Sequence, residues 1–173
     1  ATADFAPVAA DSPAELASVA WSTVALPHRV DVVGKSIDVS WYRFAVDLPE
    51  RPADLWAIYE RRPRTNLAMF VNGVQLTSAA QARRPYTHDW APRLVPIPNS
   101  LLRAGRNDVL IRSASEPPAS RLDQTYIGPY EVLAAAHDRH LLLDVTAKQA
   151  TLAAMLLFAV LFGVIHVLRR RDT

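Results

Sequence analysis

The 173-residue sequence contains no cysteine, and this absence excludes several kinds of chemistry. Disulfide bonds, thiolate metal sites and cysteine nucleophiles all require a thiol, so none of them operates in this chain. A domain outside the cytoplasm without disulfides depends on its hydrophobic core, and the chain is long enough to form one. The sequence also lacks an Asn-x-Ser/Thr glycosylation site, which is compatible with a bacterial protein.

Familiar catalytic motifs are missing as well. The sequence has no G-x-S-x-G elbow, no H-E-x-x-H and no P-loop. Its acidic residues show no pairing typical of a glycosidase, and we expect those on predicted strands to face solvent. We therefore predict that this segment is not an enzyme and uses no cofactor.

Formal charges are absent from one long stretch, Gln149 to Leu168. A helix of that length spans roughly 30 Å, which matches the hydrocarbon core of a bilayer. Arg169, Arg170 and Arg171 follow directly, and such a cluster marks the cytoplasmic side of a span. A buried core helix is the alternative, but core helices rarely show this combination. We predict a transmembrane helix at 149–168 and a cytoplasmic stub at 169–173, with the preceding chain in the periplasm of a bacterial inner membrane.

The net charge of +2 belongs entirely to residues 169–172, so residues 1–148 carry equal numbers of acidic and basic side chains. A basic chain often binds nucleic acid, but here the excess is a topology signal and we exclude a nucleic-acid partner. The sequence starts at Ala1 without methionine, from which we expect that a signal peptide or upstream segment was removed.

Short β-prone segments separated by proline-rich turns predict a mostly β domain before the span. We expect residues 1–18 to form a leader strand or loose arm, and 19–130 to form a β-sandwich. Within it the predicted loops are His28–Ser36, Ser78–Pro92 and Glu116–Asp123. The predicted strands are Trp21–Leu26, Asp38–Leu48, Asp54–Glu60, Arg93–Ile97, Asp108–Ser113 and a hairpin, Asn66–Leu76, whose Asn72-Gly73 pair suits a type I′ turn.

A helix is predicted from Glu131 to Val145, where apolar residues recur at spacings of three and four. Neither proline nor glycine occurs between Glu131 and Phe162, so one helix can leave the domain and enter the bilayer. We treat 131–148 as a membrane-proximal helix.

Three segments, in family order, resemble galactose-binding-like jelly rolls such as the sugar-binding domain of β-galactosidases. Trp41-Tyr42-Arg43 followed by Phe44 to Pro49 resembles their "WYR…F…LP" strand. Phe70 to Gly73 resembles their "V-N-G" hairpin, and Ile97 to Arg112 resembles their "IP…LL…G-x-N…V" segment. Together these segments cover about half of the predicted sandwich.

With the membrane span, the chain is similar to extracellular sensory domains of bacterial receptors. These include seven-transmembrane receptors with diverse intracellular signalling modules, sensor histidine kinases of two-component systems and diguanylate cyclases. Tyr126 to Pro129 followed by a helix resembles the exit from such domains, whereas Glu116 to Arg121 departs from their Gly-Gly stretch. The resemblance implies a mostly β, jelly-roll sensor of a small polar ligand.

The predicted loop Ser78–Pro92 holds the candidate binding residues, because tryptophan stacks on sugars while charged and polar groups bond to them. The alternative is an ordinary loop whose Trp90 closes the edge of the core. Trp21, Trp41 and Trp56 are expected in the core. The candidate ligand-binding residues are Arg83, Arg84, Tyr86, His88, Asp89 and Trp90, with Arg64 from a neighbouring loop.

Histidines raise two further possibilities. His137 and His140 have the spacing of metal ligands on one helix face, but two histidines are too few to define a site, and a solvated helix is the alternative. We therefore predict no metal. His166 lies near the predicted headgroups, which favours an interfacial position.

Ala159 and Gly163 form a small-xxx-small pair compatible with a homodimer.

The sequence thus predicts a sensing domain for a carbohydrate, another small polar ligand or an envelope protein, whose signal passes along Glu131 to Leu168. A membrane-anchored carbohydrate-binding module and an envelope docking domain without signalling are the alternatives.

Overall fold

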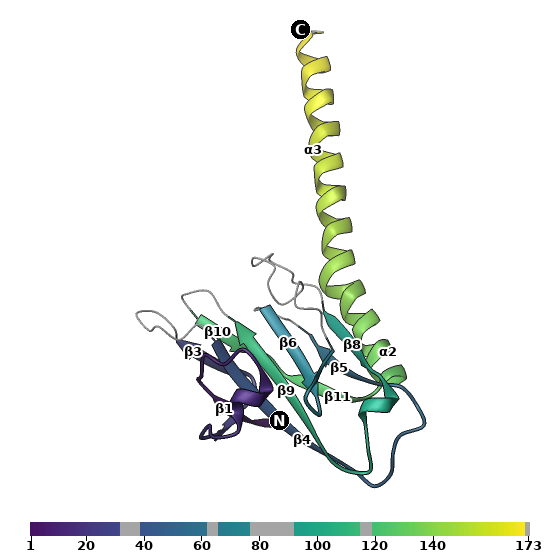
Figure 1. Cartoon of the computed structure of the whole chain (residues 1–173). Helices are drawn as coiled ribbons and strands as arrows, with labels where there is room; N and C mark the ends of the chain where they lie inside the picture. Colours follow the sequence, from purple (N-terminus) through teal and green to yellow (C-terminus); the bar gives the residue numbers. More distant parts are fainter. Residues whose placement is uncertain (32–38, 62–65, 77–91, 115–118, 172–173) are drawn as a thin grey trace.

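The computed structural model describes residues 1–31, 39–61, 66–76, 92–114 and 119–171. They form a mostly β domain from which one long C-terminal helix projects (Figure 1). Every strand pair in these ranges is antiparallel. The predicted combination of a β domain and a C-terminal helix is therefore confirmed.

The strands form three sheets. A two-stranded sheet pairs β10 (Ala119–Leu122) with β3 (His28–Asp31), and a three-stranded sheet has the order β11 (Thr125–Pro129), β5 (Trp56–Glu60), β8 (Arg93–Ile97). The largest sheet has the order β2 (Ser22–Ala25), β1 (Thr2–Ala6), β4 (Val39–Leu48), β9 (Gly105–Ala114), β6 (Asn66–Val71), β7 (Val74–Gln75).

Two predicted loops were wrong in part, because each contains a strand. His28–Asp31 lies in the segment expected to be a polar loop, and Ala119–Leu122 lies in the one expected to be a proline-rich loop. The two strands pair with each other across some ninety residues of sequence. Each is short and polar, so neither has the local alternation that reveals a strand, and only their long-range pairing defines them.

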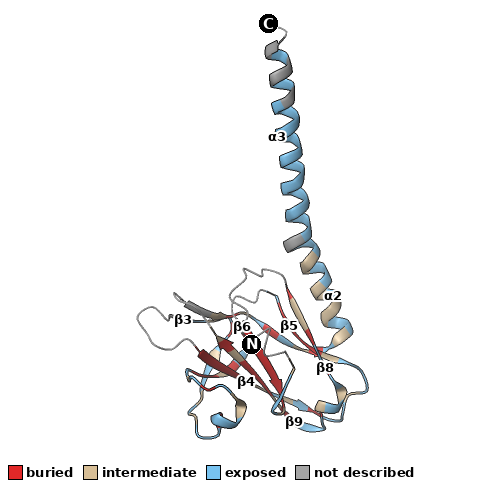
Figure 2. Ribbon diagram, turned by 45° about the horizontal axis from the view of Figure 1, so that its top comes forward, coloured by how far each residue is buried: buried red, intermediate tan, exposed pale blue. Residues whose placement is uncertain are grey.

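The main core lies between the six-stranded and the three-stranded sheets. Tyr42, Met69 and Ile111 come from the first sheet, and Ile58 and Ile97 from the second; all five are fully buried. Burial of such side chains is the chief stabilising contribution in a domain without disulfides. Figure 2 shows the buried residues concentrated on these strands, while the distal helix is exposed from Ala147 to Gly163.

A second apolar cluster lies on the other face of the large sheet. Trp41 and Phe70 pack there with ring centroids 5.4 Å apart, beneath Ala10 and Leu16 of the N-terminal segment. The indole nitrogen of Trp41 donates to the carbonyl of Ala10 at 3.0 Å. Of the two possibilities for residues 1–18, the strand is present as β1, and the residues after it cover this face.

The predicted hairpin is confirmed. Asn72 and Gly73 both have positive φ, +48° and +84°, between β6 and β7. Both residue types tolerate this region, and glycine does so without strain. A short 3-10 helix follows Pro98, at Asn99–Leu101.

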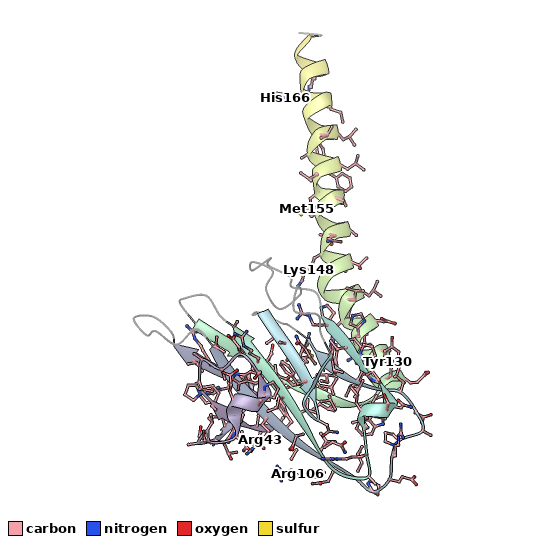
Figure 3. The ribbon with its side chains drawn as sticks, viewed as in Figure 1. Arg43, Arg106, Tyr130, Lys148, Met155 and His166 are labelled. Atoms are coloured by element: carbon pink, nitrogen blue, oxygen red, sulfur yellow. The ribbon has the colours of Figure 1, made fainter. Side chains whose placement is uncertain are left out.

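The helix is continuous in three parts: α2 (Tyr130–His140), a π-helical segment (Leu141–Thr146) and α3 (Ala147–Arg171). This confirms the helix predicted from Glu131 into the apolar run. Within the described residues, one helix, Tyr130–Gly163, is long and apolar enough to cross a membrane. Figure 3 shows Tyr130 beside the domain and Lys148, Met155 and His166 successively farther from it.

Candidate functional site

The predicted binding loop cannot be compared with the structure. Arg83, Arg84, Tyr86, His88, Asp89 and Trp90, together with Arg64, lie outside the described residues. Arg93, the first residue of β8, is described and pairs in register with Glu60 at the end of β5.

The histidines of α2 contact a tyrosine instead of facing solvent alone. His140 lies with its ring nearly parallel to that of Tyr59, at an interplanar angle of 7° and a centroid distance of 6.1 Å. His137 meets the same ring edge-on at 6.3 Å and lies 2.9 Å from the Asp138 carboxylate through Nδ1. Within the described residues no group of three or more His, Cys, Asp or Glu is placed to hold a metal ion. Both histidines therefore help to seat α2 on the sheet.

A pocket of about 400 Å³, here called the α2 pocket, lies between the helix and the outer face of the three-stranded sheet. Its described residues come from β5 and the position directly after it, from β10, β11 and the β10–β11 connection, and from α2. They are Tyr59, Arg61, Arg121, Asp123, Gln124, Tyr126, Val132, Leu133, Ala136, Arg139 and His140.

Strand alternation explains why the two tyrosines form one wall. Ile58 belongs to the main core, so its neighbour Tyr59 faces the opposite side of the sheet, toward α2. Tyr126 is the register partner of Tyr59 on β11, and their rings are stacked with centroids 6.0 Å apart. Tyr59 is 2% exposed whereas Tyr126 is 46% exposed, so Tyr126 presents its ring to the pocket opening.

The polar residues of the pocket are mainly basic. Arg61, Arg121 and Arg139 come from three separate segments, and among the described residues that line the pocket Asp123 is the one carboxylate. Arg121 Nη2 lies 3.7 Å from Asp123 Oδ1, so this carboxylate offsets part of the positive charge. The arrangement favours an anionic group at the polar end of the pocket.

Glu60 lies behind the tyrosine wall and contradicts the expectation that acids on strands face solvent. It is 1% exposed, and its Oε1 accepts a hydrogen bond from the Thr125 hydroxyl at 3.2 Å. Burial raises the pKa of Glu60 to about 7, against the lowering effects of Thr125 and Arg93. Side chains two positions apart in a strand lie on the same face, so Glu60 shares the face of Ile58 in the strand Trp56–Glu60. The alternation of this segment in the sequence could therefore have predicted that Glu60 points into the core.

Buried Tyr42 and half-buried His28 form a second polar contact in the sandwich. Burial, and secondarily the charge of Glu60, raises the pKa of the Tyr42 phenol. The Tyr42 hydroxyl is 3.1 Å from Nδ1 of His28, whose pKa is lowered by burial. These groups bond to one another within the sandwich, whereas the α2 pocket opens at its surface.

No protein-family model matches the chain, and no curated protein matches it. Solved structures similar to it include a GH2 β-galacturonidase from Eisenbergiella tayi bound to glycerol, with TM-score 0.46, 11% identity and 67% of this chain covered. The exo-chitosanase CsxA of Amycolatopsis orientalis has a TM-score of 0.47 and 14% identity over 67% of this chain. A β-glucuronidase of Faecalibacterium prausnitzii has a TM-score of 0.49 and 15% identity over 66% of this chain. The similarity spans only 18%, 16% and 20% of those chains, in the same order.

Proposed function

We propose that this chain is the extracytoplasmic sensing domain of a bacterial inner-membrane signalling receptor, a sensor histidine kinase or diguanylate cyclase. In this proposal residues 19–130 are a galactose-binding-like jelly roll, and Glu131 to Leu168 carries the signal through the membrane. Arg169 to Arg171 lie in the cytoplasm, as positive residues beside a span usually do.

One observation carries the proposal: the walls of the α2 pocket come from both the sandwich and the helix that leaves it. A ligand held between Tyr126 of the sheet and Arg139 of α2 contacts two parts that can move relative to each other. It shifts the helix if it binds one arrangement more tightly than another, and equal affinity for both shifts nothing.

The continuity of the helix allows a shift at the pocket to reach its distal end. Its hydrogen-bonded backbone runs from Tyr130 to Arg171 without a break, and both junctions around the π-helical segment keep right-handed helical geometry. At about 1.5 Å per residue, Gln149 lies roughly 13 Å along the axis from His140, so a tilt at the pocket reaches the bilayer surface directly.

The coupling can be measured because the chain has no cysteine of its own. Cysteines introduced at the exposed positions Val74 on β7 and Ala135 on α2 accept spin labels without background labelling. In nanodiscs, a ligand found by a thermal-shift screen of sugars, organic acids and divalent metals should change the label-to-label distance. Binding without any change in distance would leave a membrane-anchored binding module, not a receptor.

The gene gives an independent test. A histidine-kinase or cyclase domain encoded in frame after the codon for Thr173 is the expected result. A stop codon there would overturn the receptor and favour the anchored module or the docking domain.

A further inference from the structure

We propose that the α2 pocket binds a small organic carboxylate that carries a flat apolar ring. This inference rests on the proposed function, because it names the class of ligand that the sensing domain takes. The pocket volume of about 400 Å³ is that of a site for a small molecule.

The carboxylate is inferred from the three arginines. Guanidinium groups bind planar carboxylates through paired hydrogen bonds, and the same pocket is lined by Arg61 directly after β5, Arg121 of β10 and Arg139 of α2. Asp123 lies 3.7 Å from Arg121 and offsets part of the positive charge on that side of the pocket, while Arg139 brings a further guanidinium to the lining from α2.

The ring is inferred from the opposite walls. Tyr126 of β11 presents an exposed aromatic ring, and α2 contributes Val132, Leu133 and Ala136 to the same pocket. An aromatic face opposite aliphatic side chains leaves a slot that suits a flat apolar body. Inorganic phosphate would satisfy the arginines but has nothing to fill this slot.

Hydrogen bonds of the two pocket tyrosines fix the surfaces that a ligand would contact. The Tyr126 hydroxyl donates to Gln124 Oε1 at 2.6 Å, which fixes the ring that forms the slot. Tyr59 lies beneath it and is held to His140 of α2. A ligand bound with its ring on Tyr126 and its carboxylate near Arg139 therefore bridges sheet and helix.

The test uses the full chain in phosphatidylcholine nanodiscs and isothermal titration with four probes: benzoate, its neutral isostere benzamide, acetate and inorganic phosphate. Saturable binding of benzoate, with the other three each at least about tenfold weaker, is expected, because each lacks either the charge or the ring. If benzamide binds as tightly as benzoate, the arginines do not recognise the charge of the ligand. If acetate or phosphate binds as tightly as benzoate, the ring of the ligand does not contribute to binding. Absence of benzoate binding would overturn the site outright.

Variants locate the binding. Arg139→Gln and Tyr126→Leu, both at exposed positions, should each weaken benzoate about tenfold. Arg106→Gln is the matched control, since Arg106 is exposed on β9 and is not among the pocket residues (Figure 3). Unchanged affinity in both pocket variants would overturn the assignment, as would an equal loss in the control.

The two proposals fail in different ways. If benzoate binds but the distance between labels at Val74 and Ala135 stays constant, the proposed ligand site is supported and the proposed receptor function is contradicted. If benzoate does not bind but another ligand changes the label-to-label distance, the receptor function is supported and the proposed carboxylate site is contradicted.

Discussion

The phenol oxygen of Tyr59 lies 2.5 Å from Nδ1 of His140, and the two rings are nearly parallel. Tyr59 is on β5 of the sandwich, and His140 is the last residue of α2 before the π-helical segment. The contact joins the sheet to the helix where the helix departs from the domain. It therefore holds the orientation of the C-terminal helix relative to the sheets.

Removing the Tyr59 hydroxyl should loosen this junction. Tyr59→Phe keeps the ring but leaves His140 without its phenol partner, so we expect a loss of about 1 kcal/mol in unfolding free energy and faster amide exchange in α2. Hydrogen exchange followed by mass spectrometry measures the second effect. Tyr126→Phe is the control, because that hydroxyl donates to Gln124 and not to the helix; equal exchange in the two variants would contradict the prediction.

The sequence motifs proved most informative where local chemistry decides the structure. Asn72 and Gly73 form the turn that their tolerance of positive φ predicts. The structure adds a contact that spacing could not show: Asn72 Nδ2 donates to Asn107 Oδ1 at 2.9 Å, joining two of the motifs that carry the jelly-roll resemblance. A contact between residues 35 positions apart requires the fold itself.

Asn107 should therefore matter for stability more than an average polar residue. It is fully buried, and its side chain donates to the carbonyls of Arg103 and Gly105 and accepts from the backbone N–H of Arg103. Asn107→Ala leaves these groups unsatisfied, so we expect a loss of about 2–4 kcal/mol. Urea unfolding followed by tryptophan fluorescence checks this, with exposed Arg106→Ala expected within about 0.5 kcal/mol of wild type. A loss below about 1 kcal/mol for Asn107→Ala would contradict the argument.

Glu60 gives the domain a pH-dependent stability. Its pKa is raised from 4.5 in the unfolded chain to about 7 in the folded one, so the folded state holds the proton more tightly. The stability it contributes is fully present below pH 4.5, falls progressively above it and is lost once the pH passes about 7. The total loss amounts to about 3 kcal/mol.

Glu60→Gln should remove this dependence, because glutamine keeps the size and the acceptor oxygen but cannot ionise. The variant is expected to match wild type near pH 4.5 and to be more stable at pH 8, as measured by urea unfolding across that range. Glu50→Gln, at an exposed position, should leave the pH profile as it is in wild type. Parallel profiles for wild type and Glu60→Gln would show that Glu60 does not titrate as described.

The remaining features depended on long-range packing. β3 and β10 lack alternation and exist by pairing with each other. The α2 pocket needs β5, β10, β11 and α2 together, so no run of residues in the sequence marks it. By contrast the helix of Tyr130 to Arg171 follows from local features, namely its apolar content and the absence of proline and glycine from Glu131 to Phe162, and it was predicted almost to its ends.

The last prediction concerns transmission along that helix. The backbone N–H of Ala147 donates to the carbonyl of Leu142 and closes the π-helical segment. Proline at this position removes the donor and clashes with the preceding turn, so Ala147→Pro should uncouple the pocket from α3 while leaving ligand affinity unchanged. Ala147→Ser keeps the N–H and serves as the control.

The readout is the labelling rate of a single cysteine introduced at His166 by a water-soluble maleimide, with and without ligand. In the proposed topology, a ligand that shifts the helix changes the depth of position 166 in the bilayer interface. The labelling rate should therefore depend on ligand in wild type and in Ala147→Ser. In Ala147→Pro it should not, although titration still shows binding. A rate that still responds to ligand in the proline variant would mean that the signal does not need a rigid helix through Ala147, and the transmission route proposed for Glu131 to Leu168 would fail.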